Sequence, residues 1–165
     1  MSDEGWFVVN ATEATWHVEP RFGRYTAFER EGAPFPDFGI NIRVIEPGQT
    51  STMYHAEDGQ EGFLVLSGEC LLLVDGEEHR LRAWDYFHCP AGTPHGFVGA
   101  GDGPCAILMV GARYGGEEPP VRYVADATAA RHDAAVAEDT TSPAEAYPGR
   151  VYHDVSYLPG SLPGA

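Results

Sequence analysis

Residues 70–81 read CLLLVDGEEHRL, two short runs of strand-forming residues on either side of Asp75-Gly76. An Asp-Gly pair between alternating or apolar runs is a strong signal for a two-residue β-hairpin turn. The stretch therefore predicts two antiparallel strands joined by a tight turn. It also indicates the fold class, because the same alternation of short strands and turn residues continues on both sides of it.

Outside this hairpin, runs rich in β-branched and aromatic residues alternate with turn residues along most of the chain. The 20 glycines and 13 prolines are scattered between these runs, where they end strands and form turns. Regularly spaced short strands are typical of an all-β sandwich or barrel. The predicted strands cover residues 6–9, 22–29, 39–46, 62–66, 70–74, 79–82, 86–89, 95–99, 105–112 and 121–124.

The last forty residues differ in composition. Residues 126–139, DATAARHDAAVAED, are alanine-rich and predict a helix with Asp126 as its N-cap. A tail with several aromatic residues follows and needs a surface on which to pack. We therefore expect one structural domain, with N-terminal strands in 1–34 packed on a barrel in 35–125, and a helix and tail in 126–165.

Composition narrows the range of partners. The chain has 165 residues and a net charge of −15, with ten arginines and no lysine. Such a surface repels nucleic acid and anionic membranes, so neither is expected as a partner. No apolar run approaches the roughly 20 residues of a membrane-spanning helix, and the N-terminus lacks the pattern of a secretory signal. A soluble, cytoplasmic protein is the expectation.

The three cysteines are spaced without a CxxC motif and lie in apolar, strand-like surroundings. Buried free thiols are the expected state, and a thiolate metal site is disfavoured at this spacing. These residues are Cys70, Cys89 and Cys105.

Residues 47–68, PGQTSTMYHAEDGQEGFLVLSG, resemble the first motif of the cupin superfamily. That motif is a glycine, a His-x-His pair, a glutamate three or four residues after the pair and, after six intervening residues, a second glycine. Gly48, Glu61 and Gly68 match it. The second histidine of the pair is absent, so the identity of the ligands in this chain depends on the register.

Residues 81–99, LRAWDYFHCPAGTPHGFVG, resemble the second cupin motif. Pro90, Gly92 and His95 match its proline, glycine and histidine in full. Both motifs at this separation, over roughly half of the chain, imply an all-β fold: a single jelly-roll (double-stranded β-helix) barrel with a C-terminal helical segment and tail.

Two registers of the first motif remain open. Counting five residues from Gly48 puts the histidine positions at Tyr54 and Ala56, which would leave no working site. A shift of one residue puts His55 and Glu57 there instead. Residues two apart on a strand point to the same face, and loops tolerate insertions better than strands do, so the second register is favoured.

In the favoured register the ligand set is His55, Glu57, Glu61 and His95. Imidazole and carboxylate ligands together suit one divalent zinc, iron, manganese, cobalt or nickel ion. With an open position, such an ion acts as a Lewis acid or activates water or dioxygen. Glu57 is either a ligand or a general base; the sequence assigns no catalytic residue.

The resemblance implies a metal-dependent enzyme on a small organic molecule, with an oxygenase-type reaction as first choice. An isomerase or lyase reaction is the alternative, as is a non-enzymatic barrel that binds a sugar or metabolite with a structural metal or none. Arg43 and Phe63 are candidate substrate contacts, although a surface ion pair is the simpler interpretation of Arg43. A homodimer is expected, as is common for cupins of this size.

Overall fold

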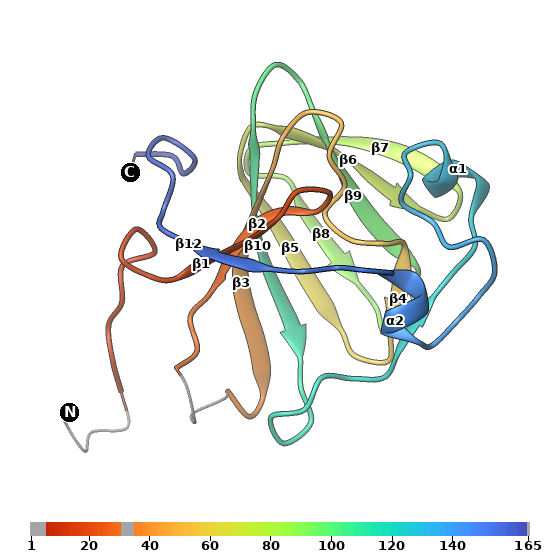
Figure 1. Ribbon diagram of the computed structural model, residues 1–165, viewed down its shortest axis with the longest axis horizontal. Coiled ribbons are helices and arrows are strands. Elements are labelled where there is room, and N and C mark those ends of the chain that lie inside the picture. The colour runs from red at the N-terminus through yellow and green to blue at the C-terminus, as the bar shows by residue number, and fades with distance from the viewer. Residues whose placement is uncertain (1–5, 31–34, 165) are drawn as a thin grey trace.

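The computed structural model describes residues 6–30 and 35–164, whose strands form two facing antiparallel sheets (Figure 1). The larger sheet contains, in spatial order, β12 (His153–Val155), β1 (Trp16–Glu19), β2 (Gly23–Ala27), β3 (Phe38–Ile45), β10 (Cys105–Ala112), β5 (Glu61–Ser67) and β8 (Tyr86–Cys89). The smaller sheet contains β11 (Val121–Tyr123), β4 (His55–Glu57), β9 (His95–Ala100), β6 (Glu69–Val74) and β7 (Glu77–Arg82). The predicted all-β jelly roll is confirmed.

The hairpin at residues 70–81 forms as predicted. Val74 pairs with Glu77 across the turn, and both central residues have positive φ, at 52° for Asp75 and 73° for Gly76. Two left-handed residues in succession are the mark of a type I′ turn, whose twist matches that of the strands it joins.

The main core lies between the two sheets. Its side chains come from alternate positions of β5, β6, β9 and β10, as expected when one face of each strand turns inward. The predicted buried thiols are confirmed, since all three cysteines are free and fully or almost fully buried there. The buried residues of this cluster are Ile45, Phe63, Val65, Cys70, Leu72, Cys89, Phe97, Cys105, Ile107 and Met109.

One expected strand is wrong. Residues 6–9 form no strand, and Trp6 and Val8 are 68% and 86% exposed. The chain instead adds β1 further on, where Trp16 is completely buried. Strand-forming side chains alone do not make a strand, because a strand also needs a partner edge and a surface on which to pack.

The helix predicted over 126–139 is a single turn, α1 (Ala127–Ala130). Asp126 caps it as predicted, since the Ala129 amide donates to its carboxylate at 2.8 Å. The chain then turns at Asp133, with φ 55°, so that Ala129 and Ala134 are both buried against the smaller sheet. Packing here overrides the helical propensity of alanine.

The C-terminal tail packs back on its own barrel. After the short helix α2 (Pro143–Ala146), β12 pairs with β1 at the edge of the larger sheet (Figure 1). Leu162 then packs in the cluster that surrounds Trp16. Strand β1 and the C-terminal tail therefore lie side by side.

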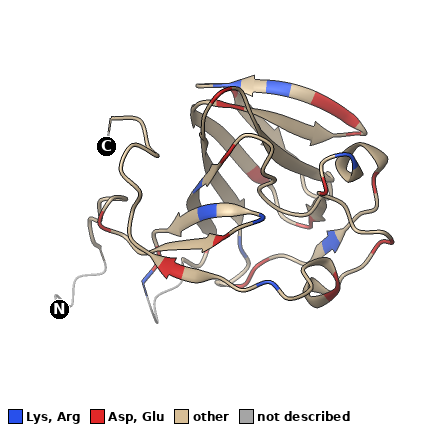
Figure 2. Cartoon of the chain, turned by 45° about the horizontal axis from the view of Figure 1, so that its top comes forward, with Lys and Arg blue, Asp and Glu red and all other residues tan. Residues whose placement is uncertain are grey.

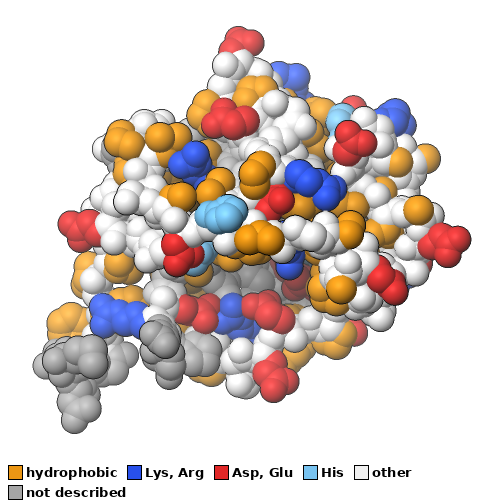
Figure 3. Space-filling model, in the orientation of Figure 1, with side chains coloured by type: hydrophobic (Ala, Val, Ile, Leu, Met, Phe, Trp, Pro, Cys, Tyr) orange, Lys and Arg blue, Asp and Glu red, His pale blue; other side chains and the backbone are white. Residues whose placement is uncertain are grey.

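Charged residues are spread over the molecule. Figure 2 shows acidic and basic residues on strands and loops alike, with both signs along the exposed edge strand β7. On the face seen in Figure 3, both signs are interspersed with hydrophobic side chains. Within the described residues, no helix has the length and apolar character needed to cross a bilayer.

Candidate metal centre

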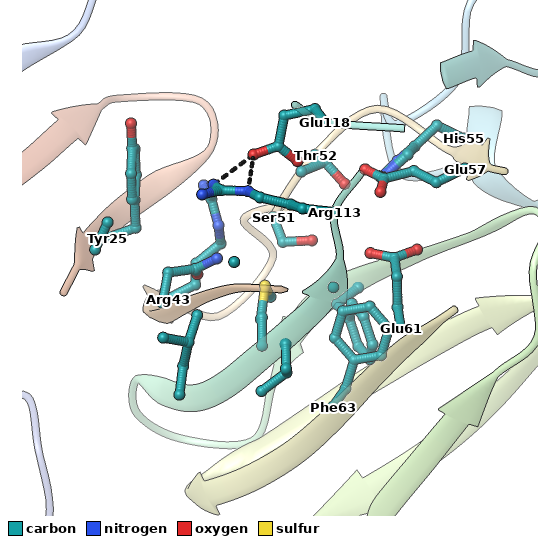
Figure 4. A pocket seen from close by; sticks show the side chains of 18 of the residues that line it. Tyr25, Arg43, Ser51, Thr52, His55, Glu57, Glu61, Phe63, Arg113 and Glu118 are labelled. Atoms are coloured by element: carbon teal, nitrogen blue, oxygen red, sulfur yellow. Dashed lines mark hydrogen bonds and ion pairs between the residues drawn. The ribbon is translucent and has the colours of Figure 1, made fainter. Parts of the chain in front are cut away.

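A cavity of about 380 Å³ lies between the two sheets. One end holds the imidazole and carboxylate groups singled out from the sequence, and the other end holds Arg43 and Tyr25 (Figure 4). Apolar side chains, among them Phe63, Phe97 and Met109, line the space. The volume is within the usual range for sites that bind small molecules.

Two adjacent strands of the smaller sheet bring the histidines together. His55 on β4 pairs directly with His95 on β9, and their ring centroids are 5.1 Å apart. His95 is 2% exposed and His55 9%. The histidine of the second cupin-like motif thus lies next to the histidine of the first motif.

The main chain fixes the orientation of both imidazole rings in the same way. The Nδ1 atom of His55 lies 2.8 Å from the carbonyl oxygen of Met53, and that of His95 lies 3.1 Å from the carbonyl oxygen of Thr93. A carbonyl only accepts, so each Nδ1 carries the proton when the ring is neutral. Each Nε2 then presents a lone pair, which is the arrangement typical of metal-ligating histidines.

Two carboxylates complete the cluster. The Glu61 Oε2 atom lies 3.6 Å from the His95 Nε2 atom, and the Glu57 Oε1 atom lies 3.6 Å from the His55 Nε2 atom. One ligand atom from each of His55, Glu61 and His95 lies within 4.8 Å of the others. Figure 4 shows the carboxylates of Glu57 and Glu61 directed into the same end of the cavity.

The pKa shifts show how strongly these groups depend on one another. Burial, with the nearby Glu57, raises the pKa of Glu61 to about 8. Burial, with the nearby His55, lowers the pKa of His95 to about 3. Burial alone would lower the pKa of His55, but the nearby carboxyl groups of Glu57 and Glu61 outweigh it and raise that pKa.

The structure places His55 and Glu57, not Tyr54 and Ala56, at the cavity. The Tyr54 side chain packs on the other side of the strand, in the cluster with Leu73 and the residues that follow α1. The extra residue after Gly48 is absorbed in the irregular segment before β4, as expected if a loop yields more easily than a strand.

The ligand cluster fits a divalent metal ion. The Glu61 Oε2 atom is buried and has no hydrogen-bond partner among the described residues, which costs free energy unless something else satisfies it. Two imidazole nitrogens and one or two carboxylate oxygens form a donor set suited to first-row divalent ions. His55, Glu61 and His95 are therefore the residues that would hold the ion, with Glu57 beside them.

The two candidate substrate contacts both line the cavity. Phe63 is 4% exposed, and its ring centroid is 5.0 Å from that of His95. Arg43 is 8% exposed, so its interpretation as a surface ion pair is wrong. The alternation along β3 turns Arg43 and Asn41 inward together.

Several cavity residues carried no signal in the sequence. They come from strands and loops whose facing becomes visible only when the sheets are paired, and no motif surrounds them. Ser51 and Arg113 belong to this group, and so does Tyr25, whose ring lies 4.9 Å from the Arg43 guanidinium carbon. Arg113 differs from Arg43 because it is already paired with Glu29 and Glu118.

A family model described as "Cupin domain" matches residues 41–111, the segment that contains both motifs and all four candidate ligands. Residues 41–111 therefore form a cupin-type domain. The match begins in β3 and ends in β10, so β1, β2 and the C-terminal tail lie outside the matched part of the cupin.

Known proteins similar to this cupin have different activities. Over 50 residues, 30% of this chain and 15% of the other, it is 42% identical to quercetin 2,3-dioxygenase of Bacillus subtilis. A sugar phosphate isomerase structure from Silicibacter pomeroyi matches with 28% identity and a TM-score of 0.51, over 64% of this chain and 71% of the other. The polyketide cyclase RemF of Streptomyces resistomycificus matches with 21% identity and a TM-score of 0.60, over 70% and 83%.

These matches show the fold and leave the reaction open. The chain spans less than half the length of the curated relatives it matches. The likeness to the cyclase is one of fold alone. Because one fold hosts many reactions, the chemistry depends on the residues of the cavity.

Proposed function

We propose that this cupin is a metal-dependent enzyme that acts on a small organic molecule, with an oxygenase-type reaction as first choice. The observation that carries the proposal is the convergence of His55, Glu61 and His95 within 4.8 Å at one end of a cavity that is large enough for a small molecule. Two histidines and one carboxylate with open positions form the ligand set used by non-haem iron(II) oxygenases. A bound ion would supply Lewis acidity or dioxygen activation.

The residues around the cluster suit this role. The main-chain carbonyls hold both imidazoles with Nε2 toward the cavity. The rings of Phe63 and Phe97 contact the His95 ring and each other, and such apolar contacts exclude water from that part of the cluster. Glu57 is either a further ligand or the group that accepts a proton from the substrate. The local likeness to a quercetin dioxygenase supports the oxygenase choice.

The alternative function is a metal-dependent isomerase or lyase. It is favoured by the likeness to a sugar phosphate isomerase structure and by the closeness of Glu57 to the cluster, which suits proton transfer. A non-enzymatic barrel that binds a sugar or metabolite is a further alternative, with the metal in a structural role or absent.

Metal analysis tests the proposal. The protein is purified, reconstituted anaerobically with iron(II), manganese(II) or zinc(II), and its bound metal is counted. We expect near one equivalent of iron or manganese, lost in His95→Ala and kept in His79→Ala, whose histidine lies on the exposed strand β7.

The other outcomes have distinct meanings. Zinc held tightly with no open position would favour a structural or hydrolytic role. No bound metal after reconstitution would overturn the proposal.

A further inference from the structure

We propose that the ligand of this cavity is an organic anion with an apolar body, whose negative group binds to Arg43 while its other end faces the metal cluster. The inference deepens the proposed function, on which its second half rests. The sequence indicates Arg43 as a candidate substrate contact, and the structure shows that its side chain is buried and lines the cavity.

Arg43 is a buried cation with no acidic partner among the described residues. It is 8% exposed, and no carboxylate among the described residues lies within 4.0 Å of it. Its Nη1 atom donates to the carbonyl oxygen of Phe22 at 2.8 Å, while its Nε atom has no hydrogen-bond partner in the part of the chain that the structure describes. Leaving a buried charge unpaired costs free energy that a bound anion would recover.

Aromatic rings take the place of a counter-ion on one side. The Tyr25 ring lies 4.9 Å from the guanidinium carbon, and the Tyr152 side chain forms a hydrogen bond with the guanidinium. A ring face and a neutral hydroxyl attract a cation but do not neutralise it. The contacts hold Arg43 in place and leave its charge available to the cavity.

The other arginine of the cavity does not compete for an anion. Arg113 is paired with Glu118, as Figure 4 shows, and also with Glu29. Its charge is therefore already neutralised within the protein. Of the two arginines that line the cavity, Arg43 is the one without an acidic partner among the described residues.

The sheet register sets the shape of the ligand. Arg43 on β3 and Glu61 on β5 lie on strands separated by β10. Across β10, Glu61 is level with Gly39 of β3, because both residues pair with Gly111, and Gly39 is four residues from Arg43. With strands ~4.8 Å apart and a rise of ~3.3 Å per residue, their Cα atoms are separated by roughly 16 Å on a flat sheet. The side chains shorten this span, and apolar Phe63 and Met109 lie between.

A ligand that touches both ends therefore has an anionic group, an apolar middle and an oxygen donor for the metal. Arginine favours planar carboxylates, which it binds in a bidentate manner. Aromatic or unsaturated carboxylic acids with an oxygen substituent at the far end have this chemistry. A small, uniformly polar ligand would leave the apolar walls unused.

The test compares acids with matched neutral amides. Binding of 4-hydroxycinnamate and 4-hydroxycinnamamide is measured by titration calorimetry, with metal-free and metal-loaded protein. We expect the acid to bind at least tenfold more tightly than the amide. The preference should disappear in Arg43→Met and persist in Arg122→Met, whose arginine is exposed and outside the cavity. No preference in the wild type, or an unchanged preference in Arg43→Met, would overturn the inference.

A second measurement uses the wild-type protein and does not depend on the folding of a variant. The buried Nε–H of Arg43 is sheltered from solvent, so its NMR signal can be followed and assigned by its loss in Arg43→Lys. We expect the acid to shift this signal and the amide to leave it in place. An acid preference in protein that takes up no metal would support the role of Arg43 while overturning the proposed function, so the two can fail separately.

Discussion

At the scale of single residues, the candidate metal ligands are buried groups that disfavour one another's charged forms when no cation is present. Glu61 is held protonated near neutral pH by its burial and by Glu57, with a pKa of about 8. His95 is held neutral down to a pKa of about 3. A divalent cation would reverse the cost of ionising Glu61, because opposite charge favours the ionised carboxylate.

The stability of the metal-free protein should therefore fall as the pH rises from 6.5 to 8. The pKa of Glu61 is higher in the folded than in the unfolded chain. Between the two pKa values the unfolded chain has lost the Glu61 proton while the folded chain still binds it, so the stability present at low pH is lost as the pH rises toward 8. His95 has a lowered pKa and acts in the opposite sense, but only below about pH 6.5. The expected loss is at most about 2 kcal/mol over this window.

Urea unfolding in the presence of a chelator, at several pH values, measures this loss. His55 has a raised pKa and contributes in the same sense, so comparison with Glu61→Gln isolates the part that is due to Glu61. The variant should lose less stability between pH 6.5 and 8. Equal slopes for the two proteins would contradict the prediction.

Glu57 gives a second prediction at this scale. Because its Oε1 atom lies 3.6 Å from the His55 Nε2 atom, we expect Glu57→Gln to weaken metal binding by about tenfold or more. Glu77→Gln, on the exposed strand β7, is the matched control. Metal affinity is measured by competition with a chromogenic chelator. Unchanged affinity together with lost activity would make Glu57 a proton-transfer group and not a ligand.

At the scale of elements, the position of His95 depends on a close approach beside β9. A Cβ atom at Gly99 would lie 2.1 Å from the carbonyl oxygen of Glu46, and the Gly48 amide donates to the Gly99 carbonyl at 2.8 Å. Glycine at 99 thus lets the segment before β4 pack against β9. The segment that carries His55 is anchored in this way to the strand that carries His95.

Gly99→Ala should destabilise the fold by about 1–3 kcal/mol, the usual cost of overpacking. Gly103→Ala is the control, because nothing lies within 4 Å of a Cβ atom at that position. Chemical unfolding of the two variants and the wild type measures the difference. If Gly99→Ala were as stable as Gly103→Ala, the close approach would not constrain the chain.

The sequence predicts these elements unevenly, for physical reasons. The hairpin at 70–81 was predictable because the turn residues and the apolar runs agree, and both motifs fall where β4, β5 and β9 begin. The strands β1 and β12 were not predictable, because each is only three or four residues long. They form by pairing with each other, and the paired residues His17 and Asp154 are 137 positions apart in the sequence. The position of Arg43 was open for the same reason, since its facing depends on how β3 pairs with β2 and β10.

At the scale of the whole molecule, the expected homodimer remains a prediction. Apolar side chains gather near the N-terminus, where Trp6, Val8 and Phe38 are 68%, 86% and 47% exposed. Exposed patches of this kind on soluble proteins commonly mark interaction sites. A second copy of the chain is the partner we expect there.

Sedimentation equilibrium should therefore give twice the chain mass of 17.9 kDa. The double variant Trp6→Asp, Val8→Asp should shift the mass toward the monomer, because buried carboxylates would oppose association. Trp84→Asp, in the exposed turn before β8, is the control. A monomeric wild-type protein at high concentration would contradict the expectation.

The orientation of the two histidines has a consequence for protein engineering. The main-chain oxygens of Met53 and Thr93 hold the two imidazole rings. The orientation of the rings therefore does not depend on the side chains at positions 53 and 93, provided that the backbone conformation is kept. The apolar walls belong to other strands. A designer could therefore reshape the walls to accept different molecules while the two imidazoles stay in place.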